Sequence, residues 1–400
     1  MSSLINQIKT LSKKYLSLMI KTRRTIHMHP ELGWQEFATS KLIQAELKKA
    51  KIEYKLIKDI GILATINGAK PGKVVLLRAD MDALPLEELV NVPYKSKIHG
   101  KMHACGHDCH TANLLGVGLI LNELKKQFSG TVKLMFQPSE ETGVGGALPM
   151  VEAGILKNPQ VDAAFGLHTG GGMLGTTTFQ FGSSSGCPDD FKVELFGSGG
   201  HGAGPHKTTD LISVGAQFIA NCQMIVTRRL NPQLPALITF GEFKAGNAHN
   251  IIAPYCLLSG TCRSNNEKVR KELYDMFEDL LKTTCATNKC QYKFEYGWSY
   301  PPVVNNQQTT LLVKNTLTQL LGKKNVIEAT RPSLGGEDFA YVAKEVPATF
   351  YYVGIAKKGQ PVYCSQAHNP NFYVDDEKWF PIASTSLAEI AINFLEEQKK

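Results

Sequence analysis

Three short and largely apolar segments, each followed at once by polar residues, most constrain how this chain can fold. The segments are residues 74–78, 131–136 and 161–167. They have the length of strands, and the apolar run at 74–78 is typical of a strand buried on both faces. Helical apolar patterns lie around them at residues 3–27, 36–50 and 112–121. The sequence therefore predicts an α/β fold built on a largely buried sheet.

The residues that follow these segments are four carboxylates and a histidine, namely Asp80, Asp82, Glu140, Glu141 and His168. Open α/β sheets gather their chemistry at the carboxyl ends of the strands, so we expect one common site. An Asx turn would explain a single aspartate, and a surface helix cap would explain the glutamate pair. Neither explains why polar, metal-competent residues follow three separate segments. Adjacent carboxylates on extended backbone point to opposite sides. We therefore expect one glutamate to bind a metal and its neighbour to face what the metal holds.

The stretch 101–111, KMHACGHDCHT, concentrates histidine, cysteine and aspartate side chains that can bind a metal within eleven residues. Cys105 and His107 are two residues apart and cannot share a helix face, so we place them on a loop or strand end. Asp108 is predicted to cap the helix that follows. Cys105, His107, Glu141 and His168 are the ligand types that suit zinc. His368 adds a fifth ligand, which exceeds the four of a structural site and favours two metal ions.

The pattern changes from about residue 183, where strands are predicted at 191–196, 236–243, 255–263 and 291–296 and helices at 208–228 and 267–285. This βαββαβ order predicts a smaller α+β domain with an antiparallel sheet and two helices. The α/β alternation then resumes at residues 309–321 and continues to 380–396. A chain of 400 residues commonly forms two domains. We predict a discontinuous catalytic domain, 1–182 and 298–400, with an inserted domain at 183–297.

Composition excludes several classes of protein. The formal net charge is +8, but the basic residues are spread along the chain, so we expect no nucleic-acid partner. An apolar run of roughly 18 residues, as a membrane span needs, is lacking. The first 21 residues have neither the apolar core nor the cleavage site of a secretory signal. Nine cysteines without a CxxC pair do not indicate a disulfide scaffold. We predict a cytoplasmic protein with no membrane partner.

Two motifs have alternative interpretations. Residues 197–202, GSGGHG, match the dinucleotide fingerprint after a predicted strand. Pro205 interrupts the helix that should follow, and no acid about twenty residues later would hold a ribose, which disfavours a dinucleotide. Cys105 and His107 are also compatible with a thiol nucleophile and its base. A thiol enzyme needs one base and one orienting group, however, and does not explain carboxylates and histidines after several strands.

An ordered set of motifs resembles the aminoacylase, hippuricase and indole-3-acetyl-amino-acid hydrolase branch of the dinuclear metallopeptidase (amidohydrolase) family, which also contains bacterial carboxypeptidases. The motifs run from His29 to Phe372 and are HPELGWQE, RADMDALP, MHACGHDCHTA, QPSEE, GLH, GGHGAGPH, HNIIAP, GGEDFAYV and AHNPNF. Each motif alone is weakly specific. Their order along nearly the whole chain is highly specific.

The resemblance implies a role for each candidate residue. The metal ligands would be Cys105, His107, Glu141, His168 and His368, which would hold two divalent ions, zinc or manganese. Glu140 would be the general base and Asp82 would orient a ligand. Asp80 would hold ligand residues in position without binding the metal itself. His201 would stabilise the oxyanion, often in the partner subunit's site, and the inserted domain would be a lid and dimerisation surface. Asn250, Arg263 and Gly336 would contact the substrate.

The predicted activity is hydrolysis of the amide bond of N-acyl-L-amino acids or similar small conjugates, with a water on the two metals as nucleophile. A carboxypeptidase or dipeptidase that uses the same mechanism is the close alternative. From another class, a catalytically silent dimeric binding protein would keep the fold and lose the metals. Because Glu140 and all five candidate ligands are present, an active enzyme is favoured over the silent binding protein.

Overall fold

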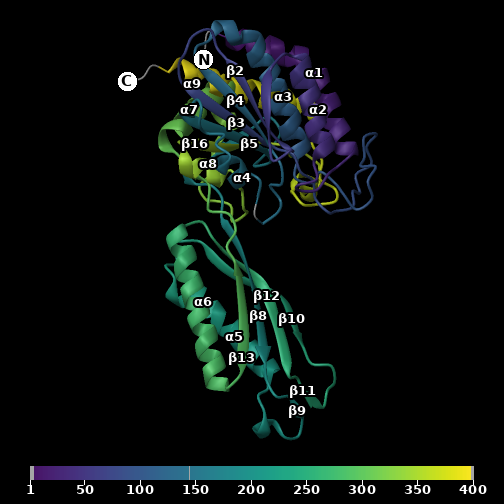
Figure 1. Cartoon of the computed structure of the whole chain (residues 1–400), viewed down its shortest axis with the longest axis vertical. Coiled ribbons are helices and arrows are strands. Elements are labelled where there is room, and N and C mark those ends of the chain that lie inside the picture. Colours follow the sequence, from purple (N-terminus) through teal and green to yellow (C-terminus); the bar gives the residue numbers. More distant parts are fainter. Residues whose placement is uncertain (1–3, 144, 398–400) are drawn as a thin grey trace. The chain divides into compact units, whose positions relative to one another are not determined.

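The computed structural model describes residues 4–143 and 145–397. The chain divides into two compact units (Figure 1). The first unit comprises the chain up to Ser184, Val303–Arg331 and the chain from Asp338 onward. The second comprises Ser185–Pro302 and Pro332–Glu337. The first unit is therefore discontinuous in sequence.

An eight-stranded mixed sheet forms the centre of the first unit, in the order β1-β2-β4-β3-β5-β16-β6-β15. Its strands are β1 (Glu53–Ile57), β2 (Gly61–Asn67), β3 (Val74–Asp80), β4 (Thr131–Gln137), β5 (Ala163–Thr169), β6 (Thr177–Phe179), β15 (Val326–Glu328) and β16 (Ala348–Val353). The neighbours β4, β3, β5 and β16 pair in parallel. Their carboxyl ends therefore meet at one edge, as expected of an α/β sheet.

Helices cover both faces of this sheet. On one face, a large core includes residues of α1 (Ile5–Met28), α2 (Phe37–Lys49), α3 (His107–Leu124), α7 (Gln307–Leu321) and α9 (Asp376–Glu396). On the other face, a smaller core includes α4 (Ala147–Glu152) and α8 (Ala340–Glu345). Because both faces are covered, every residue of β3 is buried. A two-stranded sheet of β7 (Gly182–Ser183) and β14 (Val304–Asn305) completes the unit.

The second unit has a four-stranded antiparallel sheet in the order β10-β12-β8-β13. The strands are β8 (Cys187–Phe196), β10 (Ala236–Ala245), β12 (Tyr255–Ser264) and β13 (Gln291–Gly297). Helices α5 (Leu211–Met224) and α6 (Glu267–Asn288) share its hydrophobic core. A small ribbon of β9 (Gly200–His201) and β11 (Ile251–Ile252) lies beyond the end of β8. The alternating burial of β8 is typical of a sheet covered on one face.

The predicted fold class, α/β with an additional antiparallel α+β part, is confirmed. Most element boundaries lie within a few residues of the prediction; for example, the helix predicted from residue 3 begins at Ile5, and residue 3 itself lies outside the described residues. The cap predicted for Asp108 is wrong. Gly106, with φ of 92°, is the N-cap of α3 and Asp108 lies in its first turn. Among the described residues, no helix is long and apolar enough to cross a membrane.

Candidate metal centre

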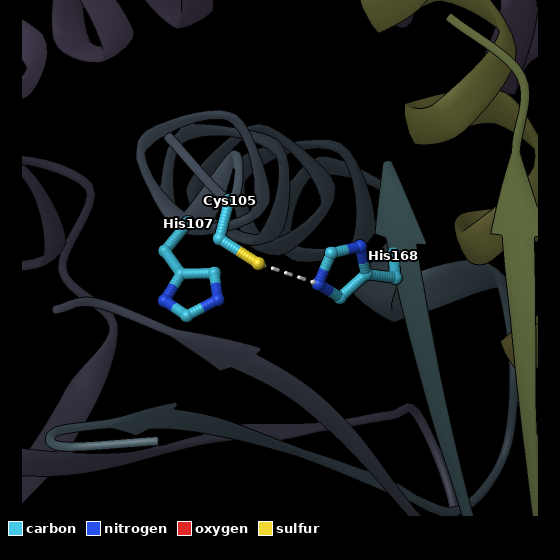
Figure 2. Close-up of side chains that lie close together, drawn as sticks. All are labelled: Cys105, His107 and His168. Carbon is cyan, nitrogen blue, oxygen red and sulfur yellow. Dashed lines mark hydrogen bonds between the residues drawn. The ribbon is translucent and has the colours of Figure 1, made fainter. Parts of the chain in front are cut away.

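The five sequence-predicted ligands come together in the first unit, next to the carboxyl ends of its parallel strands. They come from the loop before α3 (Cys105), the first residue of α3 (His107), the turn after β4 (Glu141), β5 (His168) and the loop before α9 (His368). Their donor atoms form overlapping clusters in which all atoms lie within 4.8 Å of one another. Cys105, His107 and His168 are one such cluster (Figure 2). Cys105, Glu141 and His368 are another.

The imidazole of His107 is buried and has one nitrogen without a hydrogen-bond partner among the described residues, namely Nε2. Three carboxylate oxygens surround this nitrogen at 3.6 Å (Asp80), 3.9 Å (Glu141) and 4.0 Å (Glu140). Burial disfavours a charge on His107, but the negative charge of Asp80, with a further contribution from Cys105, outweighs it and raises the pKa of the imidazole. The surroundings of Nε2 therefore attract positive charge.

Cys105 and His168 face each other, with 3.4 Å between Sγ and Nε2. The other ring nitrogen of His168, Nδ1, donates to the carbonyl of Thr169 at 2.7 Å, so the lone pair of the ring is on Nε2, facing the thiol of Cys105. Burial lowers the pKa of His168, so the ring is neutral, the form that binds metals. Burial also raises the pKa of the Cys105 thiol, and a bound divalent ion would reverse this by stabilising the thiolate.

His368 meets Glu141 at the other side of the cluster, with 3.1 Å between Nε2 and Oε1. The backbone of His368 has φ of 63°, a left-handed conformation that is uncommon for a residue other than glycine. Its N–H donates to the carbonyl of Ala104 at 2.8 Å. The loop before α9 is thereby attached to the residue preceding Cys105, which aims the imidazole at Glu141.

This donor set fits divalent metal ions. Two ligands that each lie about 2.0–2.3 Å from one ion are roughly 3–4 Å apart, and the separations around His107, Cys105 and Glu141 have that size. A thiol, three imidazoles and a carboxylate are the ligand types that zinc prefers. Nε2 of His107 is buried and has no hydrogen-bond partner among the described residues. The donor atoms of the five residues are therefore close enough together to hold divalent ions.

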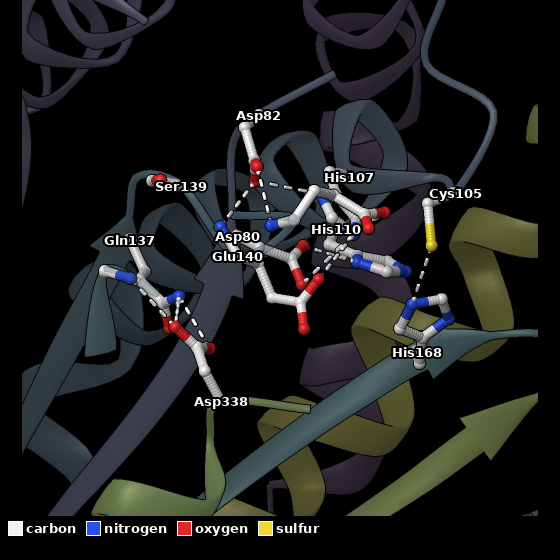
Figure 3. Close-up of polar contacts among 12 residues, drawn as sticks. Asp80, Asp82, Cys105, His107, His110, Gln137, Ser139, Glu140, His168 and Asp338 are labelled. Carbon is white, nitrogen blue, oxygen red and sulfur yellow. Dashed lines mark hydrogen bonds and ion pairs between the residues drawn. The ribbon is translucent and has the colours of Figure 1, made fainter. Parts of the chain in front are cut away.

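Asp82 connects His107 to both glutamates (Figure 3). Its Oδ1 accepts from the backbone N–H of Glu140 at 2.9 Å and from Nδ1 of His107 at 3.2 Å. Its Oδ2 accepts from the backbone N–H of Glu141 at 2.9 Å. One buried carboxylate therefore positions a ring from α3 and the turn after β4.

Asp80 and His110 are hydrogen-bonded to each other beside His107. Oδ1 of Asp80 accepts from Nδ1 of His110 at 2.6 Å, and Oδ2 accepts from Nη1 of Arg78 at 2.7 Å. Nε2 of His110 accepts from the backbone N–H of Thr169 at 2.8 Å, which assigns the proton to Nδ1. Both ring nitrogens of His110 are occupied, although Asp80, His107 and His110 form a compact cluster. The supporting role of Asp80 remains a prediction.

The turn after β4 differs from the extended backbone predicted for Glu140 and Glu141. Ser139 has φ of 57°, so the chain turns sharply there, and both carboxylates approach Nε2 of His107. The expectation that they point to opposite sides is wrong for this reason. Glu36, in the predicted HPELGWQE motif, accepts from the N–H of Ser139 at 2.6 Å and holds the turn. Burial and the nearby Asp82 raise the pKa of Glu36 to about 8.

Asp338 is a buried residue of the site that sequence reasoning missed. Its carboxylate accepts from the side chain of Gln137 at 2.7 and 2.8 Å, from Nη2 of Arg78 at 2.9 Å, and from the N–H groups of Gly146 and Ala147 at 2.9 Å. Burial raises its pKa to about 6. Asp338 thus supports β3 and β4 where they end. Its place in the GGEDFAYV motif was the available signal.

Comparisons with known proteins agree with this geometry. Residues 76–393 match Peptidase family M20/M25/M40. The chain belongs to this family. It is 36% identical to IAA-amino acid hydrolase ILR1-like 4 of Arabidopsis thaliana, over all of this chain and 91% of that protein. It is also 36% identical to thermostable carboxypeptidase 2 of Saccharolobus solfataricus, over 98% and 99% of the two chains.

Among solved structures, the YXEP protein of Bacillus subtilis, a dinuclear metal-binding peptidase from the M20 family, superimposes with a TM-score of 0.81. It is 31% identical and the match covers 96% of this chain and 99% of that one. The M20 chain described here is therefore a metal-dependent hydrolase of amide bonds. The predicted family, enzyme class and general reaction are confirmed.

In this M20 chain, a buried ion network lies behind the metal centre. Oδ2 of Asp108 accepts from Nε of Arg23 and from Nδ1 of His27, each at 2.7 Å. His27 also contacts Glu88 at 3.1 Å, and Arg23 contacts Asp376 at 3.2 Å. Burial opposes the charge on Asp108, but Arg23 and His27 outweigh it and lower its pKa. The aspartate next to His107 thus attaches the start of α3 to α1.

Replacing Asp108 by asparagine should lower the free energy of unfolding by about 3–5 kcal/mol, because Arg23 and His27 lose a buried counter-charge. Urea denaturation of the purified variant measures this loss. Glu328→Gln is the matched control, since Glu328 pairs with Lys314 at 2.9 Å with side chains 49% and 40% exposed. The control should change stability by no more than about 1 kcal/mol. Equal losses in both variants would contradict the role given to the buried network.

The second unit contains the four remaining predicted residues, in two groups. His201 in β9 pairs with Ile251 of β11, and Asn250 accepts from the N–H of Gly202 at 2.8 Å. Arg263 lies in β12 opposite Pro188 of β8, and its Nη1 donates to the carbonyl of Leu334 at 3.1 Å.

Gly336 belongs with the second of these groups. A Cβ atom there would lie 2.6 Å from Cγ of Pro188, so the backbone approaches the start of β8 closely. His201 and Asn250 lie beyond the opposite end of β8, whose last residue, Phe196, pairs with Tyr255. The eight residue-to-residue steps from Pro188 to Phe196 span roughly 25 Å of strand. The structure therefore brings the five predicted ligands together in the first unit. The other four predicted residues form two separate groups, at opposite ends of the second unit.

Proposed function

We propose that this M20 chain hydrolyses the amide bond of N-acyl-L-amino acids or similar small conjugates at a dinuclear metal centre. The observation that carries the proposal is the cluster of Cys105, His107, Glu141, His168 and His368 around a buried nitrogen with no partner among the described residues. The Arabidopsis relative is named a hydrolase of an amino-acid conjugate, which supports this substrate class.

These five residues are the proposed ligands of two divalent ions, zinc or manganese. When bound, the ions would polarise a substrate carbonyl and make water more acidic. Cys105 faces His168, and Glu141 meets His368. Glu141 belongs to one cluster with His107 and Glu140 and to another with Cys105 and His368, so its carboxylate would help to hold the ions.

Glu140 is the proposed general base. Its side chain is largely buried, and its Oε2 lies 4.0 Å from Nε2 of His107, beside the proposed ligands. The carboxylate would accept a proton from the attacking water and pass it to the nitrogen that leaves. Asp82 fixes the backbone of Glu140, so the base has a defined position when the substrate binds.

Asp82→Asn should weaken metal binding by about 10–100-fold. The NH₂ group of the asparagine would face either a backbone N–H or Nδ1–H of His107, and two donors cannot form a hydrogen bond. Metal retained after dialysis against graded chelator measures the loss. Asp162→Asn is the matched control: Asp162 accepts from the backbone N–H of Val74 at 2.7 Å, at the opposite end of β3. Metal affinity equal in both variants would show that Asp82 does not position the ligands.

Chelation should abolish hydrolysis, and zinc or manganese should restore it. Elemental analysis should give about two metal ions per chain. A panel of N-acetyl amino acids, N-benzoyl amino acids and dipeptides distinguishes the proposed deacylase from a carboxypeptidase, which the Saccharolobus relative supports as the second candidate. A metal-free protein that hydrolyses no member of the panel after metal return would instead be a silent binding protein.

We further propose that the chain is a homodimer in which the second unit acts as a lid and as the dimerisation surface. Arg263 and Gly336 lie at one end of its sheet, and His201 and Asn250 lie beyond the other. If all four contact one substrate, they must come from two chains. Phe196, Ile251 and Tyr255, at the His201 end of the sheet, are 37–55% exposed, which supports an apolar partner surface there.

We place the protein in the cytoplasm. All nine cysteines are free thiols, as is usual in a reducing compartment. Cell fractionation with an antibody to the chain tests this placement.

A further inference from the structure

The end of α6 brings together two cysteines that the metal centre does not use. The helix ends at Asn288, and Lys289 adopts the left-handed conformation with φ of 52°. The N–H of Lys289 donates to the carbonyl of Ala286 at 3.3 Å, and the N–H of Cys290 donates to that of Cys285 at 3.1 Å. These two bonds define a Schellman motif with Cys285 and Cys290 at the two positions whose side chains characteristically touch.

The backbone geometry permits a bond between the two sulfurs. A Cα atom lies about 1.5 Å from its own nitrogen and about 2.4 Å from its own carbonyl oxygen. The 3.1 Å hydrogen bond therefore holds the two Cα atoms within about 7 Å, the upper limit of the distance that a disulfide spans. Burial, followed by electrostatic interaction and a hydrogen bond with Cys290, raises the pKa of Cys285 to about 12. The two thiols are thus direct neighbours.

We propose that Cys285 and Cys290 form a redox-modification site, a dithiol that a low-molecular-weight disulfide such as glutathione disulfide converts to an intramolecular disulfide. Cys290 is half-buried and Cys285 is buried, so Cys290 is the thiol that solvent reaches first. The new bond would join the end of α6 to the start of β13. This site belongs to the second unit and does not depend on the proposed hydrolytic function.

The reaction balances with one glutathione disulfide. The thiolate of Cys290 attacks one sulfur of the reagent and releases the first glutathione thiolate. Cys285 then loses its proton to solvent and attacks the sulfur of Cys290, which releases the second glutathione. Two protons and two electrons leave the cysteine pair, and the reagent disulfide is reduced to two thiols. The second step is the slower one, because the buried thiol of Cys285 ionises poorly.

Tryptic mapping tests the proposal directly, because Lys282, Lys289 and Lys293 place the two cysteines in separate peptides, residues 283–289 and 290–293. The full chain is incubated with glutathione disulfide, its remaining thiols are alkylated in denaturant, and it is digested. We expect the two peptides to be joined in most chains and to separate after reduction. Cys285→Ser should leave glutathione on Cys290.

Two further variants complete the test. Cys290→Ser should remove the linked peptide, whereas Cys364→Ser, at a half-buried thiol of the first unit, should leave its yield unchanged. The proposal is overturned if wild-type protein shows both peptides only alkylated or glutathionylated at a reagent concentration that fully modifies Cys364. It is also overturned if the linked peptide forms only after the protein has been unfolded.

Discussion

Glu140→Gln is expected to reduce kcat by about 10²–10⁴-fold while the metal content stays at the wild-type level. Glutamine has nearly the same shape, and the backbone N–H of residue 140 would still donate to Asp82. What the variant loses is the carboxylate that accepts and returns a proton. Steady-state kinetics on the best substrate of the panel, with elemental analysis of the same sample, measures both quantities.

The neighbouring glutamate provides a matched control, since Glu141→Gln makes the same chemical change one residue away. Glu141 pairs with His368 and belongs to two ligand clusters, so its variant should lose metal. Loss of metal from the Glu140 variant to the same extent would make Glu140 a ligand instead of a base. Wild-type turnover in the Glu140 variant would exclude it from the reaction.

His201→Ala is expected to lower kcat by about 10²–10³-fold without a change in metal content, because a hydrogen-bond donor to the developing oxyanion is lost. His201 is exposed, and its Nδ1 accepts from the backbone N–H of Ala203 at 3.1 Å. Truncation should therefore leave the second unit folded, which circular dichroism can check. The proposed dimer also predicts that His201 of one chain acts in the active site of the partner chain.

Two inactive variants should restore activity when they are mixed. In a dimer of one Glu140→Gln chain and one His201→Ala chain, the chain that retains Glu140 receives the partner's His201. Random exchange of equal amounts makes half the dimers mixed, each with one complete site, so about a quarter of wild-type activity should return. Mixed samples that stay inactive, although mass spectrometry shows exchanged dimers, would place His201 in its own chain's site or remove it from catalysis.

Much of the fold follows from local sequence pattern. The buried runs of β3 and β4 have the length and composition of strands covered on both faces, and the alternation in β8 is typical of a half-exposed sheet. These patterns depend on neighbours along the chain, so a single sequence contains them. The domain limits near residues 183 and 298 remain a prediction; the compact units divide after Ser184 and Pro302, and the second unit also contains Pro332–Glu337.

The candidate site was predictable as a set of residue types but not as a set of contacts. Cys105 and His107 stand out by spacing and chemistry, and their assignment as ligands remains a prediction. His110 lies only three residues after His107, and no local feature of the sequence separates a ligand from a supporting histidine. The difference comes from Asp80 and the backbone of Thr169, which occupy both nitrogens of His110.

By itself, the sequence determined which side chains are available and at which strand ends they lie, because strand and helix periodicity is a local property. Only the tertiary structure decided what each side chain does. Asp108 binds Arg23, 85 residues away, instead of capping its helix. The backbone turn at Ser139, whose N–H donates to Glu36, directs both glutamates toward His107. Hydrogen bonds and ion pairs act over a few ångströms. The orientation of a polar side chain is therefore set by its neighbours in space, which the order of residues does not state.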